Sequence, residues 1–114
     1  MELIIDTREN VIKKEFESNE DVSIQQLDIG DIIFKYENEI FLLIERKSIR
    51  DFVDSIKSGR YREQKYRILS NVDKDKVIYL IEGDLNQYVS VSGMATTSLD
   101  SAIINLLIRD NIKV

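Results

Sequence analysis

Acidic and basic side chains gather at the end of one apolar run of the sequence. The run "IFLLI" spans 40–44 and is followed at once by Glu45, Arg46 and Lys47. Side chains two positions apart on a strand share a face, so Glu45 and Lys47 should point the same way, with Arg46 pointing opposite. We therefore expect Glu45 to hold a metal ion and Lys47 to face a reaction centre.

Three further acids are placed where they can join this pair. Asp6 ends the first predicted strand, Glu9 follows it, and Asp31 begins the first strand of a predicted hairpin. The start of one hairpin strand lies beside the end of the next, so Asp31 and Glu45 should meet at one edge of the sheet. Carboxylates at short range repel one another unless a cation lies between them, and a hard divalent cation suits oxygen ligands.

The residue types that are missing narrow the chemistry further. The chain has no cysteine and no histidine, which excludes thiolate and imidazole metal ligands, a Ser-His triad and a histidine general base. Any metal must then be bound by oxygen, which indicates magnesium, manganese or calcium. A lysine such as Lys47 can position the attacking water or stabilise developing charge. Together these groups suffice for metal-assisted hydrolysis of a phosphodiester.

Each residue, taken alone, also has a purely structural explanation. Asp6 and Glu9 would suit the N-terminus of the first helix, because acids favour helix N-termini. Asp31 follows Gly30 and would suit a turn. The charges at 45–47 could simply be exposed at a strand end. For Asp6, Glu9 and Asp31 the structural explanation is the stronger one in isolation, and the chemical interpretation depends on the combination.

The elements that must position these residues alternate along the chain. Hydrophobic periodicity predicts strands at 2–6, 22–28, 31–37, 40–47 and 76–83, and helices at 9–18, 49–58, 60–72 and 97–111. Ser48 is the expected cap of the second helix, with Asp51 as its capping-box partner, and Gly59 its expected stop. Thr97 or Ser98 should cap the last helix. Strands alternating with helices indicate a single α/β domain built on a mixed sheet, and "IKV" at 112–114 could begin a further strand.

The charge distribution is uneven. The net charge is −5, but residues 46–67 hold 8 basic and 3 acidic residues, a balance of +5. Residues 1–45 hold 4 basic and 12 acidic residues, a balance of −8, and residues 68–114 hold 4 and 6, a balance of −2. A local basic patch can bind phosphates whatever the total charge. From charge alone, a solvated helix face with ion pairs is the simpler explanation.

A longer string of residues carries a resemblance to a known family. The sequence reads "GD" at 30–31, then 13 residues, "ERK" at 45–47, "SIR", and Asp51. This resembles the nuclease signature of the XPF-type structure-specific endonuclease family. The segments "IIDTRE" at 4–9 and "SGRYREQKYRI" at 58–68 also look like segments of that family, in the same order.

The resemblance implies a fold, an activity and a cofactor. The family has a restriction-endonuclease-like, three-layer fold, with a central mixed β-sheet flanked by helices. Its members use Mg²⁺ or Mn²⁺ to cut one strand of branched DNA near a duplex–single-strand junction, as in a 3′-flap, a fork or a nicked junction. The alternative is a non-catalytic DNA-binding or dimerisation subunit with the same fold, since some relatives have lost the acids.

The resemblance also implies a role for each matching residue. Asp6, Asp31 and Glu45 would be metal ligands, Glu9 an accessory acid, Lys47 the water-positioning lysine, and Arg46 a support for the site or for a phosphate. The DNA contacts would come from Arg8, Arg60, Arg62, Gln64, Lys65 and Arg67. Contacts of this kind are salt-dependent and insensitive to base sequence.

Partners and cellular location follow from the same resemblance. The family works as homo- or heterodimers, and the apolar helix at 98–109 is a possible contact, although an ordinary core helix explains it better. Residues 1–114 would form one nuclease domain, without the helix-hairpin-helix domain that usually follows. The sequence contains no export signal and no apolar run long enough for a membrane span. We therefore expect no membrane partner and an intracellular, DNA-containing compartment, the nucleus in a eukaryote.

Overall fold

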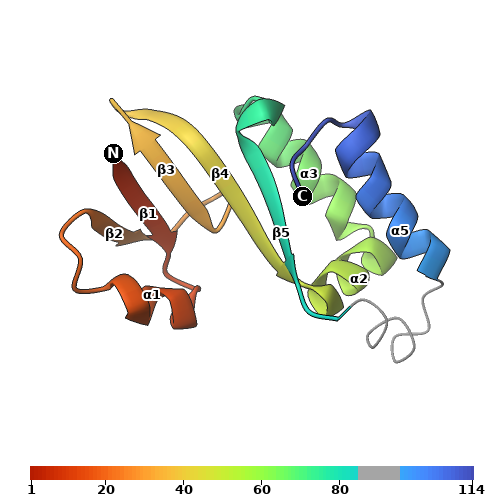
Figure 1. The fold of residues 1–114 in the computed structure, drawn as a ribbon, viewed down its shortest axis with the longest axis horizontal. Helices are drawn as coiled ribbons and strands as arrows, with labels where there is room; N and C mark the ends of the chain where they lie inside the picture. The colour runs from red at the N-terminus through yellow and green to blue at the C-terminus, as the bar shows by residue number, and fades with distance from the viewer. Residues whose placement is uncertain (85–95) are drawn as a thin grey trace.

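A five-stranded mixed sheet forms the centre of the computed structural model, which describes residues 1–84 and 96–114. The strands are β1 (Glu2–Asp6), β2 (Val22–Gln25), β3 (Ile32–Tyr36), β4 (Glu39–Ser48) and β5 (Val77–Glu82). They lie in the order β2-β1-β3-β4-β5 (Figure 1). β1 pairs with β2, and β4 with β5, in parallel, whereas β3 is antiparallel to both of its neighbours. The predicted mixed sheet flanked by helices is therefore confirmed, as is the hairpin over 31–47.

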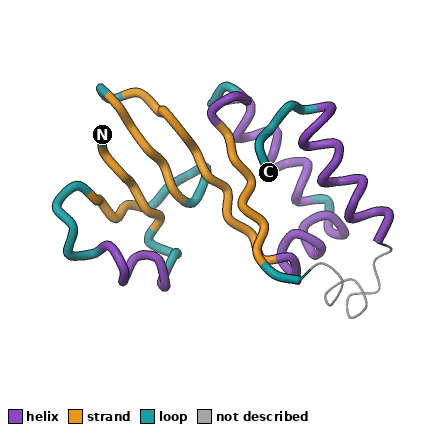
Figure 2. Tube along the Cα trace, in the orientation of Figure 1, coloured by secondary structure: helices purple, strands orange, loops and turns teal. Residues whose placement is uncertain are grey.

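The helices lie mostly at the β5 side of the sheet (Figure 2). They are α1 (Asn10–Phe16), α2 (Ile49–Ser58), α3 (Arg60–Asn71) and α5 (Thr96–Ile104), with a 3-10 turn at Lys74–Lys76 and a π-helix at Asn105–Arg109. α1 lies beside β1. No helix in the described part of the chain is long and apolar enough to cross a bilayer.

Several elements are shorter than their apolar patterns predict. β2 ends at Gln25, so a loop leads from it to β3, and α1 ends at Phe16. The last helix changes to π geometry after Ile104, because Asp110 N donates to Asn105 O, five residues back, at 2.9 Å. At the C-terminus the expected strand is a single parallel bridge between Lys113 and Ile78. The predicted caps Thr97 and Ser98 lie outside the described side chains.

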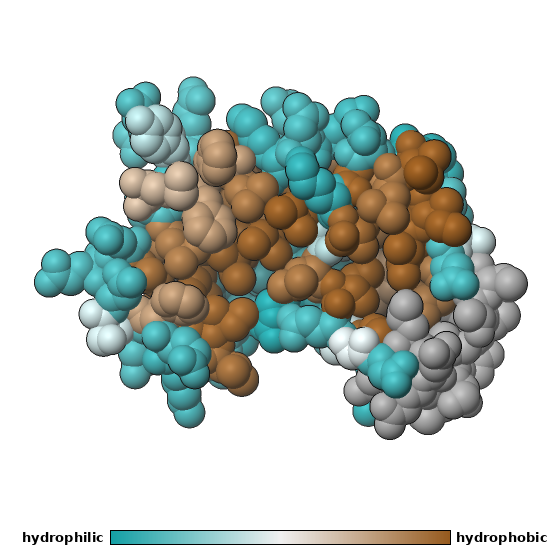
Figure 3. Space-filling view, in the orientation of Figure 1, coloured by the Kyte–Doolittle hydropathy of each residue, from teal (hydrophilic) through white to brown (hydrophobic). Residues whose placement is uncertain are grey.

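One hydrophobic core lies between the sheet and three helices. The sheet contributes Ile33 from β3, Leu43 from β4 and Tyr79 from β5. The helices contribute Phe52 from α2 and Leu106 from the π-helix, and all five side chains are buried. Leu43 lies on a strand that is apolar on both faces, but only one face of this strand is well covered, since Phe41 of the same strand is 58% exposed. Figure 3 shows that the opposite face of the sheet is also largely apolar.

The junctions at both ends of α2 decide how the basic segment meets the sheet. The Ser48 hydroxyl accepts a hydrogen bond from Asp51 N at 3.1 Å, which confirms the predicted cap where β4 ends. Gly59 ends α2 in the left-handed conformation, at φ +81°, and α3 begins at the next residue. The chain therefore turns back sharply, and α3 runs beside the end of β4 that carries the charged residues.

Candidate active site

Backbone hydrogen bonds bring three strand ends together at the acidic residues. Asp6 N donates to Asp31 O at 2.9 Å, and Asp31 N donates to Ile44 O at 2.9 Å. The Asp31 carboxylate then accepts a hydrogen bond from Arg46 N at 2.7 Å, on the far side of Glu45. Asp31 is thus held between the end of β1 and the end of β4. The expectation that Asp31 and Glu45 lie at one sheet edge agrees with this register.

Gly30 allows Asp31 to reach that position. Its φ of +73° lies in the left-handed region, which disfavours residues that carry a Cβ. A Cβ added at Gly30 would lie 2.7 Å from Leu43 Cγ, well inside van der Waals contact. Only glycine fits against the core at this point, and it turns the chain so that Asp31 faces β4.

A cleft of about 430 Å³ lies between the strand ends and α3. One wall carries Asp31, Glu45 and Lys47 from the sheet edge. Arg60, Gln64 and Arg67 from α3 line it as well. Positions 60, 64 and 67 recur at the spacing of one helix face, which explains why these three side chains share the cleft. The cleft therefore combines carboxylates with basic and amide groups, an arrangement suited to an anionic substrate.

Asp6 is engaged by a neighbouring arginine. Its side chain is 0% exposed, and it accepts hydrogen bonds from Arg8 Nη2 at 2.6 Å and Arg8 Nε at 3.2 Å. These bonds from the Arg8 guanidinium hold the pKa of the Asp6 carboxyl below its usual value. Within the described residues, no three acidic side chains are grouped as a ready-made metal site. Asp6 would have to exchange its Arg8 contacts before binding a cation.

The ionised forms of Glu45 and Asp31 are unfavourable in this site. Burial, followed by repulsion from Asp31, raises the pKa of Glu45 to about 7. Burial also raises the pKa of the Asp31 carboxyl. Lys47 Nζ lies 3.7 Å from Glu45 Oε1, and both side chains are largely buried, at 11% and 13% exposure. Two neighbouring carboxylates that resist ionisation fit a hard divalent cation, which needs oxygen ligands and would relieve their repulsion.

Arg46 and Glu9 belong to a different ion-pair group. The Arg46 guanidinium pairs with Glu9 and with Glu82, and its Nη2 lies 3.2 Å from Glu82 Oε2. This group ties the loop after β1 to β4 and to the end of β5. Burial, followed by repulsion from Asp31, raises the pKa of Glu9. Glu82 was not predicted, although its position at the end of the strand parallel to β4 is the signal that could have indicated it.

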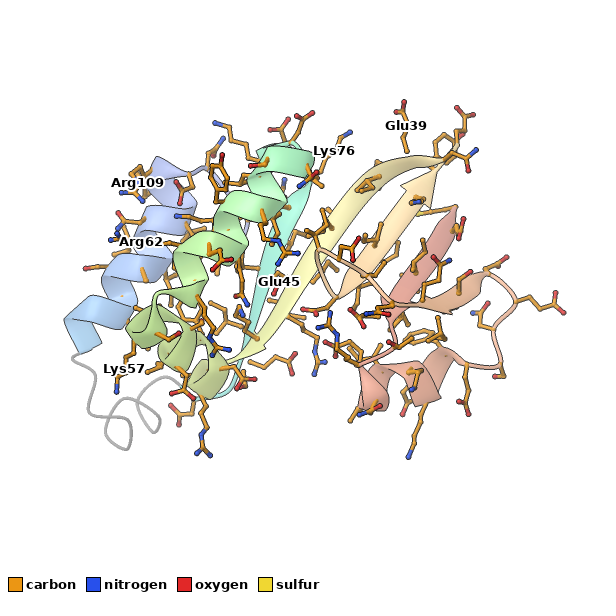
Figure 4. All side chains as sticks on the ribbon, turned by 180° about the vertical axis from the view of Figure 1, so that it is seen from behind. Glu39, Glu45, Lys57, Arg62, Lys76 and Arg109 are labelled. Carbon is orange, nitrogen blue, oxygen red and sulfur yellow. The ribbon has the colours of Figure 1, made fainter. Side chains whose placement is uncertain are left out.

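The predicted DNA contacts on α3 are divided between two faces. Arg60, Gln64 and Arg67 line the cleft, whereas Arg62 and Lys65 line a separate groove between α3 and α5, together with Arg109. Figure 4 shows Arg62 and Arg109 on the same side of the molecule, away from Glu45. Lys65 is not free, because its Nζ lies 2.8 Å from Asp110 Oδ2.

The raised pKa of Glu45 predicts a pH-dependent stability. The pKa of Glu45 is about 7 in the folded protein, above its usual value of 4.5. Protonated Glu45 therefore adds its full contribution to stability below pH 4.5, and this contribution is lost as the pH rises through 7. In metal-free buffer, Glu45→Gln should therefore raise the free energy of unfolding at pH 8 by about 3 kcal/mol. At pH 4 the variant and the wild type should differ little. Urea unfolding at several pH values measures this.

Glu39→Gln is the matched control for this prediction. Glu39 starts the same strand but is exposed (Figure 4), so its substitution should change stability by similar small amounts at both pH values. If the stability of Glu45→Gln and of Glu39→Gln depended on pH in the same way, the raised pKa assigned to Glu45 would be wrong.

Comparisons with known proteins place this chain in a family. The ERCC4 domain model matches residues 5–114. The chain is 35% identical over 106 residues to the probable crossover junction endonuclease mus81 of Dictyostelium discoideum, covering 81% of this chain and 11% of that protein. It is 35% identical over 95 residues to the crossover junction endonuclease MUS81 of Arabidopsis thaliana, covering 77% of this chain and 14% of that protein.

A viral relative and a solved structure agree with these matches. The ERCC4 domain-containing protein EP364R of African swine fever virus is 35% identical over 95 residues, covering 80% of this chain and 25% of that protein. Among solved structures, XPF from Aeropyrum pernix in complex with DNA superposes with a TM-score of 0.74 at 26% identity, covering 98% of this chain and 54% of that chain.

The chain spans about a tenth to a quarter of the length of these curated relatives. Within that span the family model covers nearly every residue, including both walls of the cleft. The five-stranded mixed sheet and its flanking helices are shared with the XPF structure. By sequence and by fold, the chain belongs to the ERCC4 domain family.

Proposed function

We propose that this chain is a divalent-metal-dependent, structure-specific DNA endonuclease that hydrolyses a phosphodiester near the junctions of branched DNA. The observation that carries the proposal is the cleft in which the buried acids Asp31 and Glu45 lie beside Lys47, with Arg60 and Arg67 also lining it. Family membership supports the reaction class, because relatives are named crossover junction endonucleases.

Asp31 and Glu45 are the residues that would hold Mg²⁺ or Mn²⁺. Mg²⁺ is commonly bound through one or two carboxylates plus water and substrate phosphate, which agrees with a pair of acids in an open cleft. When bound, the ion would neutralise the charge of the reacting phosphate and make a water molecule more acidic. Asp6 could join as a third ligand after it exchanges the contacts of its carboxylate with Arg8.

The other cleft residues bind and orient the substrate. Lys47 is largely buried next to Glu45, so its ammonium group is held in place to stabilise charge that develops on the phosphate oxygens. Arg60 and Arg67 offer guanidinium groups to flanking phosphates. Arg8, whose side chain is 73% exposed, lies at the rim and would have to leave Asp6 to bind a phosphate. None of these contacts reads a base, which agrees with recognition of DNA shape.

The proposal extends to partners and location. The structural neighbour was solved with DNA, and we propose branched double-stranded DNA as the substrate of this chain. Ile104, Leu107 and Ile108 expose apolar side chains near the end of the α5 segment, and we propose this surface as a homo- or heterodimer contact. A protein acting on DNA would work in a DNA-containing compartment.

Cleavage of defined DNA substrates tests this function. The purified protein is incubated with end-labelled fork, 3′-flap, nicked and fully paired linear DNA of the same sequence, with Mn²⁺, Mg²⁺ or excess chelator. The expected result is cutting near the junction of branched DNA, at least about 10-fold slower cutting of linear DNA, and none with chelator. Cutting that persisted in chelator, or that ignored the junction, would contradict the proposal.

A further inference from the structure

A second hollow lies on the other side of α3 from the cleft. It is a groove of about 960 Å³ between α3 and the last helix, which consists of α5 and the π-helix. Its basic side chains are Arg62 and Lys65 from α3 and Arg109 from the π-helix, and none of the described residues that line it is acidic. A basic groove of this kind stands out in a chain whose net charge is −5. The proposed hydrolysis takes place in the cleft and leaves the groove without a role.

Helix geometry makes α3 a ridge between the two hollows. Successive residues of an α-helix are about 100° apart around its axis. The groove residues Arg62 and Leu69 therefore lie about 180° around α3 from the three residues that line the cleft. Tyr61 and Ile68 lie between these two faces and are buried in the core. Ligands in the cleft and in the groove would thus flank α3, about one helix diameter of 10–12 Å apart.

Two of the three basic side chains are available to a ligand. Arg62 is exposed and forms no ion pair with any described residue. The Arg109 side chain is 68% exposed, and its Nε lies 3.6 Å from Asp110 Oδ1. Lys65 is 14% exposed, and its Nζ lies 2.8 Å from Oδ2 of the same carboxylate. Lys65 therefore offsets the charge of Asp110, and the two guanidinium groups remain to bind an anion (Figure 4).

An exposed aromatic ring lies beside these guanidinium groups. Tyr66 lines the groove and is 74% exposed, so packing in the core does not explain it. It follows Arg62 by four residues, which makes the two side chains neighbours on the helix surface. A basic groove with an accessible aromatic ring is typical of sites for single-stranded nucleic acid, in which a base stacks on the ring and the backbone follows the charges. A paired duplex keeps its bases stacked inside and offers no free base to such a ring.

We propose that this groove binds the unpaired strand of the branched DNA, with a base stacked on Tyr66 and phosphates contacted by Arg62 and Arg109. The inference rests on the function proposed above and deepens it, because it gives the single-stranded arm a place of its own. The duplex beside the junction would occupy the cleft, and α3 would separate the two arms. A forked DNA then contacts both sides of α3, whereas a linear duplex contacts one side only.

The opposite wall of the groove is suited to DNA rather than to a second copy of the chain. The last helix presents Ser101, Asn105 and Arg109 to the groove, and all three are exposed. Hydroxyl, amide and guanidinium groups are common partners of phosphate and sugar oxygens. The centre of an interface between protein copies is more apolar than this wall.

The double variant Arg62→Gln/Arg109→Gln tests the phosphate contacts. Without metal, its Kd for forked DNA with single-stranded arms should rise by roughly 10-fold, while the Kd for fully paired DNA should stay within about 2-fold. The slope of log affinity against log salt for the fork should become shallower by about 1.4, since each contact with a single-strand phosphate contributes about 0.7. Lys14→Gln/Lys74→Gln removes the same charge from exposed sites on α1 and the 3-10 turn, and should leave both Kd values within about 2-fold.

Tyr66→Leu tests stacking, because leucine keeps an apolar side chain but has no ring. Affinity for forked DNA should fall by roughly 10-fold, again without a matching loss for paired DNA. A fluorescent 2-aminopurine placed at successive positions of the unpaired arm should be quenched by the wild type at one position and not by this variant. Tyr36→Leu is the matched control, since Tyr36 is 56% exposed at the end of β3, and it should behave as wild type.

Cleavage kinetics separate binding of the unpaired arm from chemistry. Because the groove does not touch the reacting phosphate, the single-turnover rate at saturating forked DNA should stay within about 2-fold in every groove variant. At DNA concentrations below the Kd, cleavage of the fork should slow by roughly 10-fold, in step with the loss of affinity. The midpoint of thermal unfolding should not change, because the substituted side chains are exposed.

Each outcome bears on either the groove or the proposed function. Unchanged affinity for forked DNA in the groove variants, with the wild type still cutting the fork, would overturn this inference and leave the endonuclease function intact. Loss of fork affinity in the variants of a protein that cuts no DNA would support the groove and contradict the endonuclease function. A changed oligomeric state in light scattering with unchanged DNA affinity would assign the groove to a second copy and overturn the inference. A wild-type protein that bound neither fork nor duplex would contradict both proposals.

Discussion

Asp31→Asn and Lys47→Met should each reduce cleavage of forked DNA by roughly 10³-fold while leaving DNA affinity within about 3-fold of wild type. Asparagine keeps an oxygen that can accept the hydrogen bond from Arg46 N, so the change removes charge rather than backbone support. Methionine replaces the largely buried Lys47 side chain at similar length and removes only the ammonium group. Single-turnover kinetics and a separate binding titration measure the two quantities.

Two remote substitutions control for indirect effects. Asp73→Asn and Lys74→Met make the same chemical changes at exposed positions beside the 3-10 turn before β5, and both should retain wild-type cleavage. Retained cleavage in Asp31→Asn or Lys47→Met would contradict the assignment of the site. If the wild type bound forked DNA but never cut it, the chain would instead be a non-catalytic DNA-binding subunit with this fold.

Gly30→Ala should cause the largest loss of stability among single-methyl additions at the site. The positive φ costs about 1 kcal/mol for alanine, and the overpacking against Leu43 should cost roughly 1–3 kcal/mol more. The clash is severe because Leu43 is fully buried and its Cγ would lie 2.7 Å from the new Cβ. The midpoint of thermal unfolding should drop by roughly 8–16 °C. Cleavage should fall as well, since Asp31 is the next residue.

Gly59→Ala is the matched control, because its φ is also positive, at +81°, but no atom lies within 4 Å of the added Cβ. This variant should lose only about 1 kcal/mol and keep its cleavage activity. The difference between the two alanine variants therefore isolates the contact with Leu43. Equal losses of stability in the two variants would contradict the tight packing between Gly30 and β4.

The fold was largely predictable because each central element carries a strong local signal. The β4 segment is apolar on both faces, and it is a long inner strand of the sheet. The apolar spacing of Ile49, Phe52 and Val53 predicted α2, and Ser48 and Gly59 marked its ends. The early end of β2 and the π-helix after α5 were not predicted. The end of β2 depends on hydrogen bonds between distant segments, and the π-helix on a hydrogen bond across five residues, and neither leaves a periodic pattern in the sequence.

The approach of Asp31 to the end of β4 was predictable from hairpin geometry, but the ion pairs around it were not. Arg8 engages Asp6 from only two residues away, a local choice of rotamer that the sequence pattern does not encode. Arg46 reaches Glu82 through the parallel pairing of β4 with β5, a long-range register. Helical spacing likewise groups Arg60, Gln64 and Arg67, but only the tertiary placement of α3 decides that this face, and not the face of Arg62, lines the cleft.

Anomalous diffraction from crystals grown with Mn²⁺ would test the central claim most directly. We predict a manganese peak about 2.1 Å from carboxylate oxygens of both Asp31 and Glu45, with Lys47 Nζ nearby but not coordinated. Asp31→Asn crystals under the same conditions should lose the peak. A peak elsewhere in the molecule, or no peak while Glu45 remains paired only with Lys47, would contradict the assignment of this cleft as a metal-dependent nuclease site.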